Sequence, residues 1–334
     1  MSTQAIVVTT INAPNDAIRD IAQFAPDWDF IVIGDTKTPA PWQFPGTRYF
    51  DVPAQQALDS QFAQLCPTRH YARKNIGYLV AIRNGASIIA ETDDDNLPYA
   101  GWLANCSKVI EARRVEKTGW ENVYTHFSRE RIWPRGFPLE LINESLRQIS
   151  HLDAPAPHEC AIQQYLANDN PDVDAVFRLT TDREIKFTPN RVVLEKGTYC
   201  AFNSQNTIWW PEAFPLLYLP SHVSFRMTDI WRSYVAQVCL YAMGGKLAFC
   251  EATMYQIRNE HSLIRDFKDE VPGYLDNMRI LDILNALSLS SEPSKAGENL
   301  RGCYEALVAA EIVPEAELPL IDAWLSDLSA MKSS

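Results

Sequence analysis

The chain has 334 residues, of which 46% are hydrophobic and 22% charged, a composition typical of a soluble globular protein with a substantial core. Its net charge of −12 argues against broad nucleic-acid binding, because phosphate contacts require clustered lysine and arginine. No apolar run reaches the roughly 18 residues that a membrane span needs, and the first residues lack the features of a signal peptide. We therefore expect neither a membrane span nor export.

The cysteines also favour a protein that is not exported. There are seven of them, and they are scattered, odd in number and free of C-x-x-C spacing. This usage fits reduced thiols better than disulfides or a zinc site. We expect a cytoplasmic protein.

The first elements predict a parallel sheet covered by helices. Residues 5–11 and 30–33 read as strands, and residues 16–24 between them read as a helix that Asn12 or Asn15 caps. In such sheets, ligands bind beyond the carboxyl ends of the strands. The polar residues at these two strand ends include Thr10, Asn12, Asp35 and Lys37.

Basic residues follow in the next predicted helices. After a short strand at 48–52, residues 53–65 and 70–84 read as helices, the second ending at Gly85. Arg73, Lys74 and Gly77 lie on the side of the second helix away from its apolar residues. A glycine in mid-helix costs about 1 kcal/mol relative to alanine, which indicates close approach of another group. A solvated basic face is the alternative to a diphosphate-binding one.

The sharpest feature is an acidic triplet, Asp93-Asp94-Asp95, directly after the apolar run at 86–90. Adjacent carboxylates repel one another, and their pKa values rise unless a cation lies among them. Oxygen ligands suit Mg²⁺ or Mn²⁺. Strand alternation predicts that Asp93 and Asp95 share one side, where they hold a metal together. An acidic turn without a metal is the alternative.

The middle of the chain has weaker patterns. Residues 98–182 are rich in Pro, Asn and Asp, and we interpret them as insertions on the ligand side of the sheet, with one helix near 161–167. Strands are expected at 191–194 and 216–219. A polar loop at 197–207 includes Asn203.

Asp229 lies in the first turn of a helix predicted at 228–243, with Thr228 as its N-cap. An acid at this position also complements the helix dipole, so a purely structural role is the alternative to a catalytic one. Two short strands at 247–250 and 254–258 are expected next. Beyond them the pattern predicts helices at about 273–289, 297–311 and 315–330.

Four of these stretches together resemble the STELLO-type glycosyltransferases. They are Thr-Thr-Ile-Asn after the first strand, Gly-Asp-x-Lys-Thr-Pro after the second, Arg-Lys-Asn-Ile-Gly-Tyr-Leu-x-Ala-Ile before the triplet, and Thr-Asp-Ile-Trp-Arg-Ser-Tyr. More distantly, the triplet and the Asp-x-Trp helix are similar to reversibly glycosylated polypeptides, which include UDP-arabinopyranose mutases. The resemblance implies an α/β fold of the GT-A kind, with a Rossmann-like mixed sheet flanked by helices. We expect a catalytic domain over residues 1–270 and a helical extension over 271–334.

The resemblance also implies the reaction. A metal-dependent enzyme, using Mn²⁺ or Mg²⁺, transfers a hexose or pentose from a nucleotide-diphosphate sugar, here a UDP-sugar, to a hydroxyl of a glycan or another acceptor, with inversion. Asp229 is then the catalytic base, and Asp93, Asp95 and His261 are the metal ligands. The expected nucleotide-sugar contacts are Thr10, Asn12, Asp35, Lys37, Arg73, Lys74, Asp93, Asp94 and Asn203, and Trp209 and Trp210 are either acceptor contacts or core aromatics. A nucleotide-sugar mutase and a non-catalytic binding protein with the same fold are the alternatives.

Overall fold

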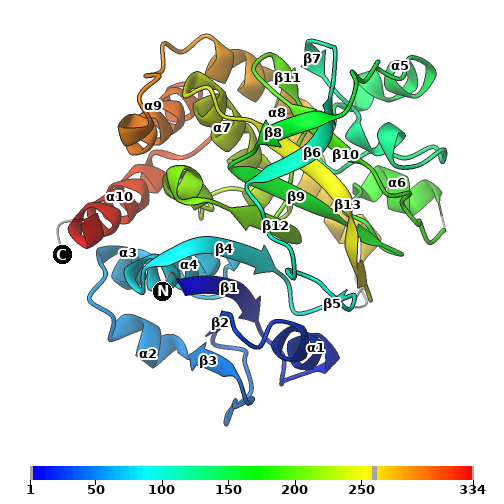
Figure 1. Ribbon diagram of the computed structural model, residues 1–334. Coiled ribbons are helices and arrows are strands. Elements are labelled where there is room, and N and C mark those ends of the chain that lie inside the picture. Colours follow the sequence, from blue (N-terminus) through cyan, green and yellow to red (C-terminus); the bar gives the residue numbers. More distant parts are fainter. Residues whose placement is uncertain (1–2, 182, 258–261, 333–334) are drawn as a thin grey trace.

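The computed structural model describes residues 3–181, 183–257 and 262–332. Within these ranges the chain forms one mixed sheet of eleven strands, with helices packed against it (Figure 1). The strand order is β3-β2-β1-β4-β12-β9-β13-β10-β6-β8, and β5 pairs with β13 outside this path. The predicted α/β architecture, a mixed sheet flanked by helices with helices at the C-terminal end, is confirmed.

The strands are β1 Thr3–Thr10, β2 Asp29–Gly34, β3 Thr47–Phe50, β4 Ala86–Thr92, β5 Asn96–Pro98, β6 Val109–Arg114, β7 Gly119–Trp120, β8 Ala156–Glu159, β9 Ile162–Asn168, β10 Arg191–Leu194, β11 Thr198–Tyr199, β12 Asn206–Trp209 and β13 Leu247–Gln256. The α-helices are α1 Asp16–Phe24, α2 Val52–Gln56, α3 Gln61–Leu65, α4 Lys74–Arg83, α5 Ile142–Arg147, α6 Ala175–Thr180, α7 Thr228–Ala242, α8 Leu263–Asn285, α9 Ala296–Ala309 and α10 Leu318–Lys332. Short 3₁₀ turns include Tyr71–Arg73, Pro211–Leu217 and Phe225–Met227.

The N-terminal half of the sheet is parallel, as predicted. Strands β3, β2, β1 and β4 run in one direction, so their carboxyl ends share one edge. Side chains of β1 alternate between two apolar clusters, with Val7 on the side of α4 and Val8 on the side of α1. Helix α1 begins as expected, because Asn15 Oδ1 accepts the backbone N–H of Ile18 at 3.1 Å.

Gly77 marks the closest contact between α4 and the sheet. A Cβ atom at this position would lie 2.5 Å from Cγ1 of Val7 and 3.0 Å from Cγ1 of Ile33. Residues 74–81 of α4 are all buried. The glycine therefore serves helix–sheet packing, and the alternative of a solvated basic face is wrong, because Arg73 and Lys74 are both buried.

The central part of the sheet departs most from the predictions. Residues 98–182 supply β6, β8 and β9 rather than insertions, and the helix expected at 161–167 is the central strand β9. Gln163 and Gln164 are buried in β9, and these polar residues hide its strand pattern. Gln163 Nε2 is satisfied by the carbonyl oxygen of Ser107 at 2.9 Å.

Other boundaries also differ. The strand expected at 216–219 is absent, since residues 216 and 217 end a 3₁₀ turn that begins at Pro211. The helix expected at 53–65 is two short helices, because Ser60 caps α3 by accepting the N–H of Ala63. The two strands expected near 247–258 are one strand, β13, with a register shift. Helix α8 begins ten residues before the predicted start and contains Pro272.

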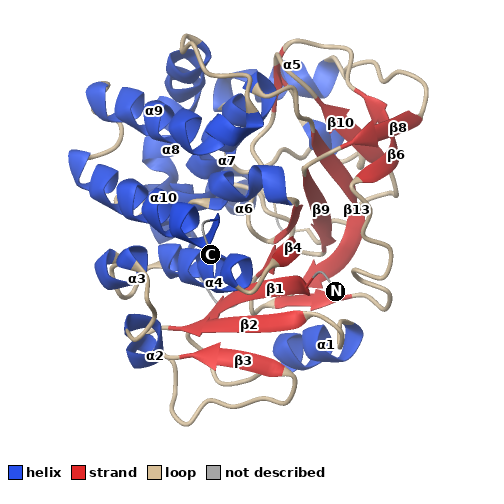
Figure 2. Ribbon diagram, turned by 60° about the vertical axis from the view of Figure 1, so that its left-hand side comes forward, coloured by secondary structure: helices blue, strands red, loops and turns tan. Residues whose placement is uncertain are grey.

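The C-terminal helices pack on the rest of the molecule. Helix α8 runs across residue 270, and α9 and α10, orange to red in Figure 1, lie on the same side of the sheet as α7 (Figure 2). Trp324 of α10 is fully buried in the large core cluster, and Asp327 accepts the hydroxyl of Ser60 at 2.6 Å. Among the described helices, none combines the length and apolar character needed to cross a membrane.

Candidate functional site

The acidic triplet forms a turn between β4 and β5 at the carboxyl edge of the parallel strands. Strand β4 ends at Thr92, so the expected alternation does not extend to the triplet. Each of the three side chains instead has its own set of polar partners. The prediction that strand periodicity sorts the three acids is therefore wrong.

Asp93 pairs with a buried cation. Its Oδ1 accepts hydrogen bonds from Nζ of Lys74 at 2.9 Å and from the hydroxyl of Tyr71 at 2.6 Å. Lys74 comes from the first turn of α4 and is fully buried, and its Nζ also donates to the carbonyl oxygen of Ser204 at 3.3 Å. The structure thus brings together the predicted pair Asp93 and Lys74.

Asp94 faces the end of β1. Its Oδ2 accepts from the hydroxyl of Thr10 at 2.5 Å and from Nδ2 of Asn12 at 3.0 Å, while its carbonyl oxygen accepts from Nδ2 of Asn15 at 2.6 Å. Burial raises the pKa of Asp94, and the bonds from Thr10 and Asn12 act against this rise. Thr10 and Asn12 therefore lie at the triplet, as predicted.

Asp95 is the acid of the triplet that has a buried carboxylate oxygen without a hydrogen-bond partner in the described ranges. Its Oδ2 accepts from Nε2 of Gln256 at 3.0 Å, but its buried Oδ1 has no hydrogen-bond partner among the described residues. Burial and the neighbouring charge of Asp93 raise the pKa of Asp95 to about 7. A buried, unpartnered carboxylate oxygen amid other acids fits a bound cation.

The metal-ligand set is small. In the described ranges, no three or more His, Cys, Asp or Glu residues are grouped so as to hold a metal ion. His261, the expected third ligand, lies outside the described residues. Mg²⁺ is commonly held by one or two carboxylates, with substrate phosphates and water completing its shell. The residues present therefore fit a cation that binds together with a diphosphate.

The other expected nucleotide contacts divide into two groups. Asp35 lies just beyond β2, where its Oδ2 accepts the N–H of His70 at 3.1 Å, and Lys37 is exposed nearby. Arg73 is 2% exposed and turns into the core, where it donates to Oε1 of Gln55 at 2.9 Å and to the carbonyl oxygen of Cys66 at 3.1 Å. Its described hydrogen bonds go to Gln55, Cys66 and Pro67 and to no acid of the triplet, so Arg73 does not lie where a diphosphate contact was expected.

Asp229 is buried in the first turn of α7. Thr228 is not the N-cap of α7 that the sequence predicts, because α7 begins at Thr228 itself and the Thr228 hydroxyl donates to the carbonyl oxygen of Ser224. Arg135 donates to the two carboxylate oxygens of Asp229 at 2.9 and 3.0 Å, and to those of Asp172 at 2.7 and 2.8 Å. Burial alone raises the pKa of Asp229, but the Arg135 guanidinium outweighs burial and brings this pKa to about 2.

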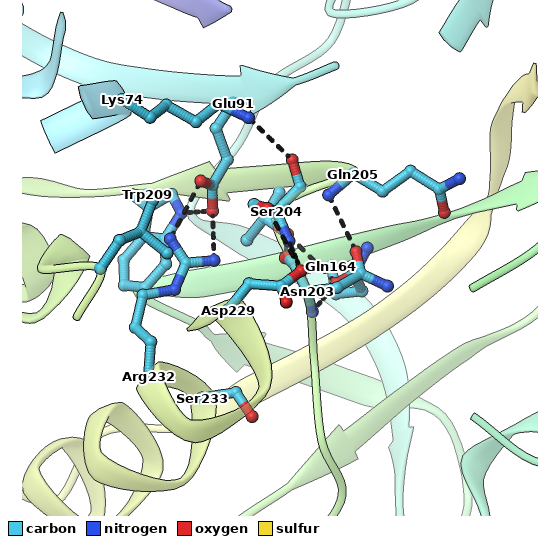
Figure 3. A network of polar contacts seen from close by, with 12 residues as sticks. Lys74, Glu91, Gln164, Asn203, Ser204, Gln205, Trp209, Asp229, Arg232 and Ser233 are labelled. Atoms are coloured by element: carbon cyan, nitrogen blue, oxygen red, sulfur yellow. Dashed lines mark hydrogen bonds and ion pairs between the residues drawn. The ribbon is translucent and has the colours of Figure 1, made fainter. Parts of the chain in front are cut away.

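The loop before β12 contacts both Lys74 and Asp229 through Ser204 (Figure 3). Asn203 Nδ2 donates to Asp172 at 2.8 Å. The backbone N–H and the hydroxyl of Ser204 both lie 3.3 Å from Oδ2 of Asp229, and the same hydroxyl lies 2.6 Å from that of Tyr71. Asn203, which the sequence predicts to be a nucleotide-sugar contact, therefore lies beside Asp172, which shares Arg135 with Asp229.

A fully buried ion pair joins α7 to β4. Arg232 and Glu91 approach at 2.9 Å, and Nε1 of Trp209 donates to Glu91 at 2.8 Å (Figure 3). Trp209 and Trp210 are both buried in apolar clusters, which is the core role left open above. Sequence reasoning did not single out Glu91 or Arg232, although a charged residue ending an apolar strand indicates a buried partner.

Fold and site together define an α/β protein with a GT-A-like sheet and an acidic site at the ends of its parallel strands. Residues 226–334 match the profile of a family described as STELLO glycosyltransferases. "Probable glycosyltransferase STELLO1" of Arabidopsis thaliana is 28% identical to the chain, in an alignment that covers 98% of the chain and 44% of the relative. "Probable glycosyltransferase STELLO2" of the same plant is also 28% identical, over 97% of the chain and 44% of the relative. The chain thus spans less than half the length of these relatives. The predicted resemblance to the STELLO-type glycosyltransferases is confirmed.

Proposed function

We propose that the chain is a metal-dependent glycosyltransferase that moves a sugar from a nucleotide-diphosphate sugar, specifically a UDP-sugar, to a hydroxyl acceptor with inversion. The glycosyltransferase class rests on the relatives, whose names describe probable glycosyltransferases. The proposed metal and the nucleotide-sugar donor rest on one observation, the buried Oδ1 of Asp95, which has no hydrogen-bond partner in the part of the chain that the structure describes and lies among three acids at the carboxyl edge of the parallel strands.

The donor half of the site consists of the triplet and its neighbours. Asp93 and Asp95 would hold Mn²⁺ or Mg²⁺, which stabilises the negative charge of the departing diphosphate when bound. Lys74 adds a buried positive charge at Asp93. Asp35 and the exposed Lys37, just beyond β2, and Thr10, on β1, would contact the base and ribose.

Asp229 is our candidate for the base that takes the acceptor proton. With a pKa of about 2 it is a weak base, since general bases work best when their pKa lies near the working pH. Both of its oxygens bind Arg135. We therefore infer that the acceptor hydroxyl replaces one of these two bonds before transfer.

The pairing of Asp229 with Arg135 also favours a second candidate function, a nucleotide-sugar-binding protein that carries out no transfer. In that case Asp229 is only the partner of a buried arginine. Substitution Asp229→Asn separates the two candidates, because it abolishes sugar transfer in an enzyme, whereas a protein that only binds the nucleotide sugar shows no transfer with either residue.

Calorimetry tests the donor site directly. We expect UDP to bind at least about tenfold more tightly with Mn²⁺ than without it, since the cation and the diphosphate complete one another's coordination. Asp95→Ala abolishes this gain. Asp27→Ala, at an exposed acid before the opposite end of β2, leaves the gain intact. Metal-independent binding, or an unchanged gain in Asp95→Ala, contradicts the proposal.

A further inference from the structure

Two hydroxyl groups form a continuous path between the acidic triplet and Asp229. The Tyr71 hydroxyl lies 2.6 Å from Oδ1 of Asp93 and 2.6 Å from the Ser204 hydroxyl. The Ser204 hydroxyl in turn lies 3.3 Å from Oδ2 of Asp229. Lys74 Nζ donates to the Tyr71 oxygen from the side, at 2.7 Å. The path therefore has three oxygen–oxygen gaps between two carboxylates.

Counting protons shows that one gap must lack a hydrogen bond. Ionised carboxylates only accept, and each hydroxyl has a single proton, so two protons serve three gaps. A proton must lie between Tyr71 and Ser204, because two lone pairs facing each other at 2.6 Å repel. Both hydroxyls therefore point the same way. Either Ser204 donates to Tyr71 and Tyr71 to Asp93, or Tyr71 donates to Ser204 and Ser204 to Asp229.

The distances show which arrangement the structure holds. The gap at Asp93 is 2.6 Å, within the normal range for a hydroxyl and a carboxylate, whereas the gap at Asp229 is 3.3 Å. The shorter contact favours the arrangement in which both hydroxyls point toward Asp93, and the contact between Ser204 and Asp229 is the weakest of the three.

We propose that Tyr71 and Ser204 are positioning residues that form a reversible hydrogen-bond link, which points to Asp93 here and turns to Asp229 when a cation occupies the triplet. A cation bound by Asp93 replaces the Tyr71 proton as the partner of that carboxylate. The Tyr71 O–H then rotates to donate to the Ser204 oxygen, and the Ser204 O–H rotates to donate to Asp229, with each proton staying on its own oxygen. Only hydrogen bonds change. The link rests on the proposed function for its cation and nucleotide.

The link predicts that cation binding and the charge of Asp229 are coupled. Coupling between two sites is reciprocal, so if a cation turns the hydroxyls toward Asp229, the Asp229 carboxylate also favours cation binding. The carboxylates of Asp93 and Asp229 are coupled through the Ser204 hydroxyl. Removing this hydroxyl abolishes the coupling and leaves both acids in place.

The affinity for UDP with Mn²⁺, measured by calorimetry, tests the link in four proteins: the natural chain, Asp229→Asn, Ser204→Ala and the double variant. We expect Asp229→Asn to weaken binding by about fivefold or more when Ser204 is present, and by less than about twofold together with Ser204→Ala. An equal effect in both backgrounds overturns the link.

Three controls separate the link from a general structural effect. Asp172→Asn removes the other carboxylate bound by Arg135. The described partners of this carboxylate are Arg135 and Asn203 rather than Ser204, so the effect of the change should not depend on Ser204→Ala. Ser233→Ala removes a buried α7 hydroxyl that donates to Ile230, and should leave the coupling intact. Ser204→Thr keeps the hydroxyl and should restore the coupling.

A second cycle needs no ligand. If the natural chain does not bind UDP with Mn²⁺, the proposed function fails, and urea unfolding of Asp93→Asn, Asp229→Asn and their combination then tests the link alone. The two acids compete for the same hydroxyls, so their effects on the unfolding constant should deviate from additivity by about threefold or more, and become additive with Ser204→Ala. Additive effects with Ser204 present overturn the link.

Discussion

At the scale of single residues, the site combines predictable acids with unpredictable partners. The sequence predicts the triplet and Asn12 because they follow strands at one edge of a parallel sheet, and Lys74 because it lies on the basic side of a helix expected just before the triplet. Arg135 and Ser204 were not, since each lies in an irregular stretch and gains its importance only from groups far away in the sequence. Arg73 shows the opposite error, because a cation next to the site in sequence is turned into the core.

Asp95 makes a prediction about pH. Its pKa is raised to about 7 in the folded protein from an ordinary value near 3.8, so the folded state binds the proton more tightly than the unfolded state. The carboxyl group therefore costs stability as pH rises from about 4 to 7. We expect Asp95→Asn to be more stable than the natural chain at pH 8, by on the order of 2 kcal/mol, and to lose this advantage at pH 4.

Urea unfolding of both proteins at the two pH values measures this difference. Asp174 has a pKa raised to about 7 by burial as well, so only the difference between the two proteins reports on Asp95. If Asp95→Asn exceeds the natural chain in unfolding free energy by the same amount at pH 4 and pH 8, the interpretation of Asp95 as a buried carboxylate with a raised pKa is wrong.

At the scale of elements, prediction succeeded where local signals agree with tertiary packing. Helix α1 has its Asn15 cap, and Gly85, whose φ of +78° suits glycine, follows the C-cap of α4 at Asn84. Prediction failed for β9, because buried glutamines are satisfied by distant backbone groups that no local pattern reveals. It also failed at the start of α8, since Pro272 reads as a helix start although it lies inside the helix.

The contact between α4 and the sheet predicts the effect of Gly77→Ala. Alanine normally stabilises a helix by about 1 kcal/mol over glycine, but here its Cβ collides with Val7 and Ile33 of the sheet. We expect a net loss of about 1–3 kcal/mol of unfolding free energy. Gly302→Ala in α9 is the matched control, because no atom lies within 4 Å of its added Cβ, and this change should be stabilising. A stabilising Gly77→Ala contradicts the packing argument.

At the scale of the whole molecule, the sheet brings two acidic regions together from opposite ends of the chain. The triplet follows β4 in the first third of the sequence, and Asp229 opens α7 in the last third. Glu91 precedes the triplet by two residues, and Arg232 follows Asp229 by three. Their buried ion pair thus fixes the distance between the proposed donor and acceptor sides of the site.

This arrangement predicts the outcome of separating the pair. Arg232→Met leaves the Glu91 charge buried without its cation, and we expect a loss of about 3–5 kcal/mol in unfolding free energy. The double variant Glu91→Gln/Arg232→Met removes both charges, keeps an acceptor for the N–H of Trp209, and should recover most of the loss. Urea unfolding of the two single variants and the double variant measures the coupling. Purely additive losses would show that the two residues stabilise β4 and α7 independently, whereas recovery shows that the ion pair itself joins the two halves of the site.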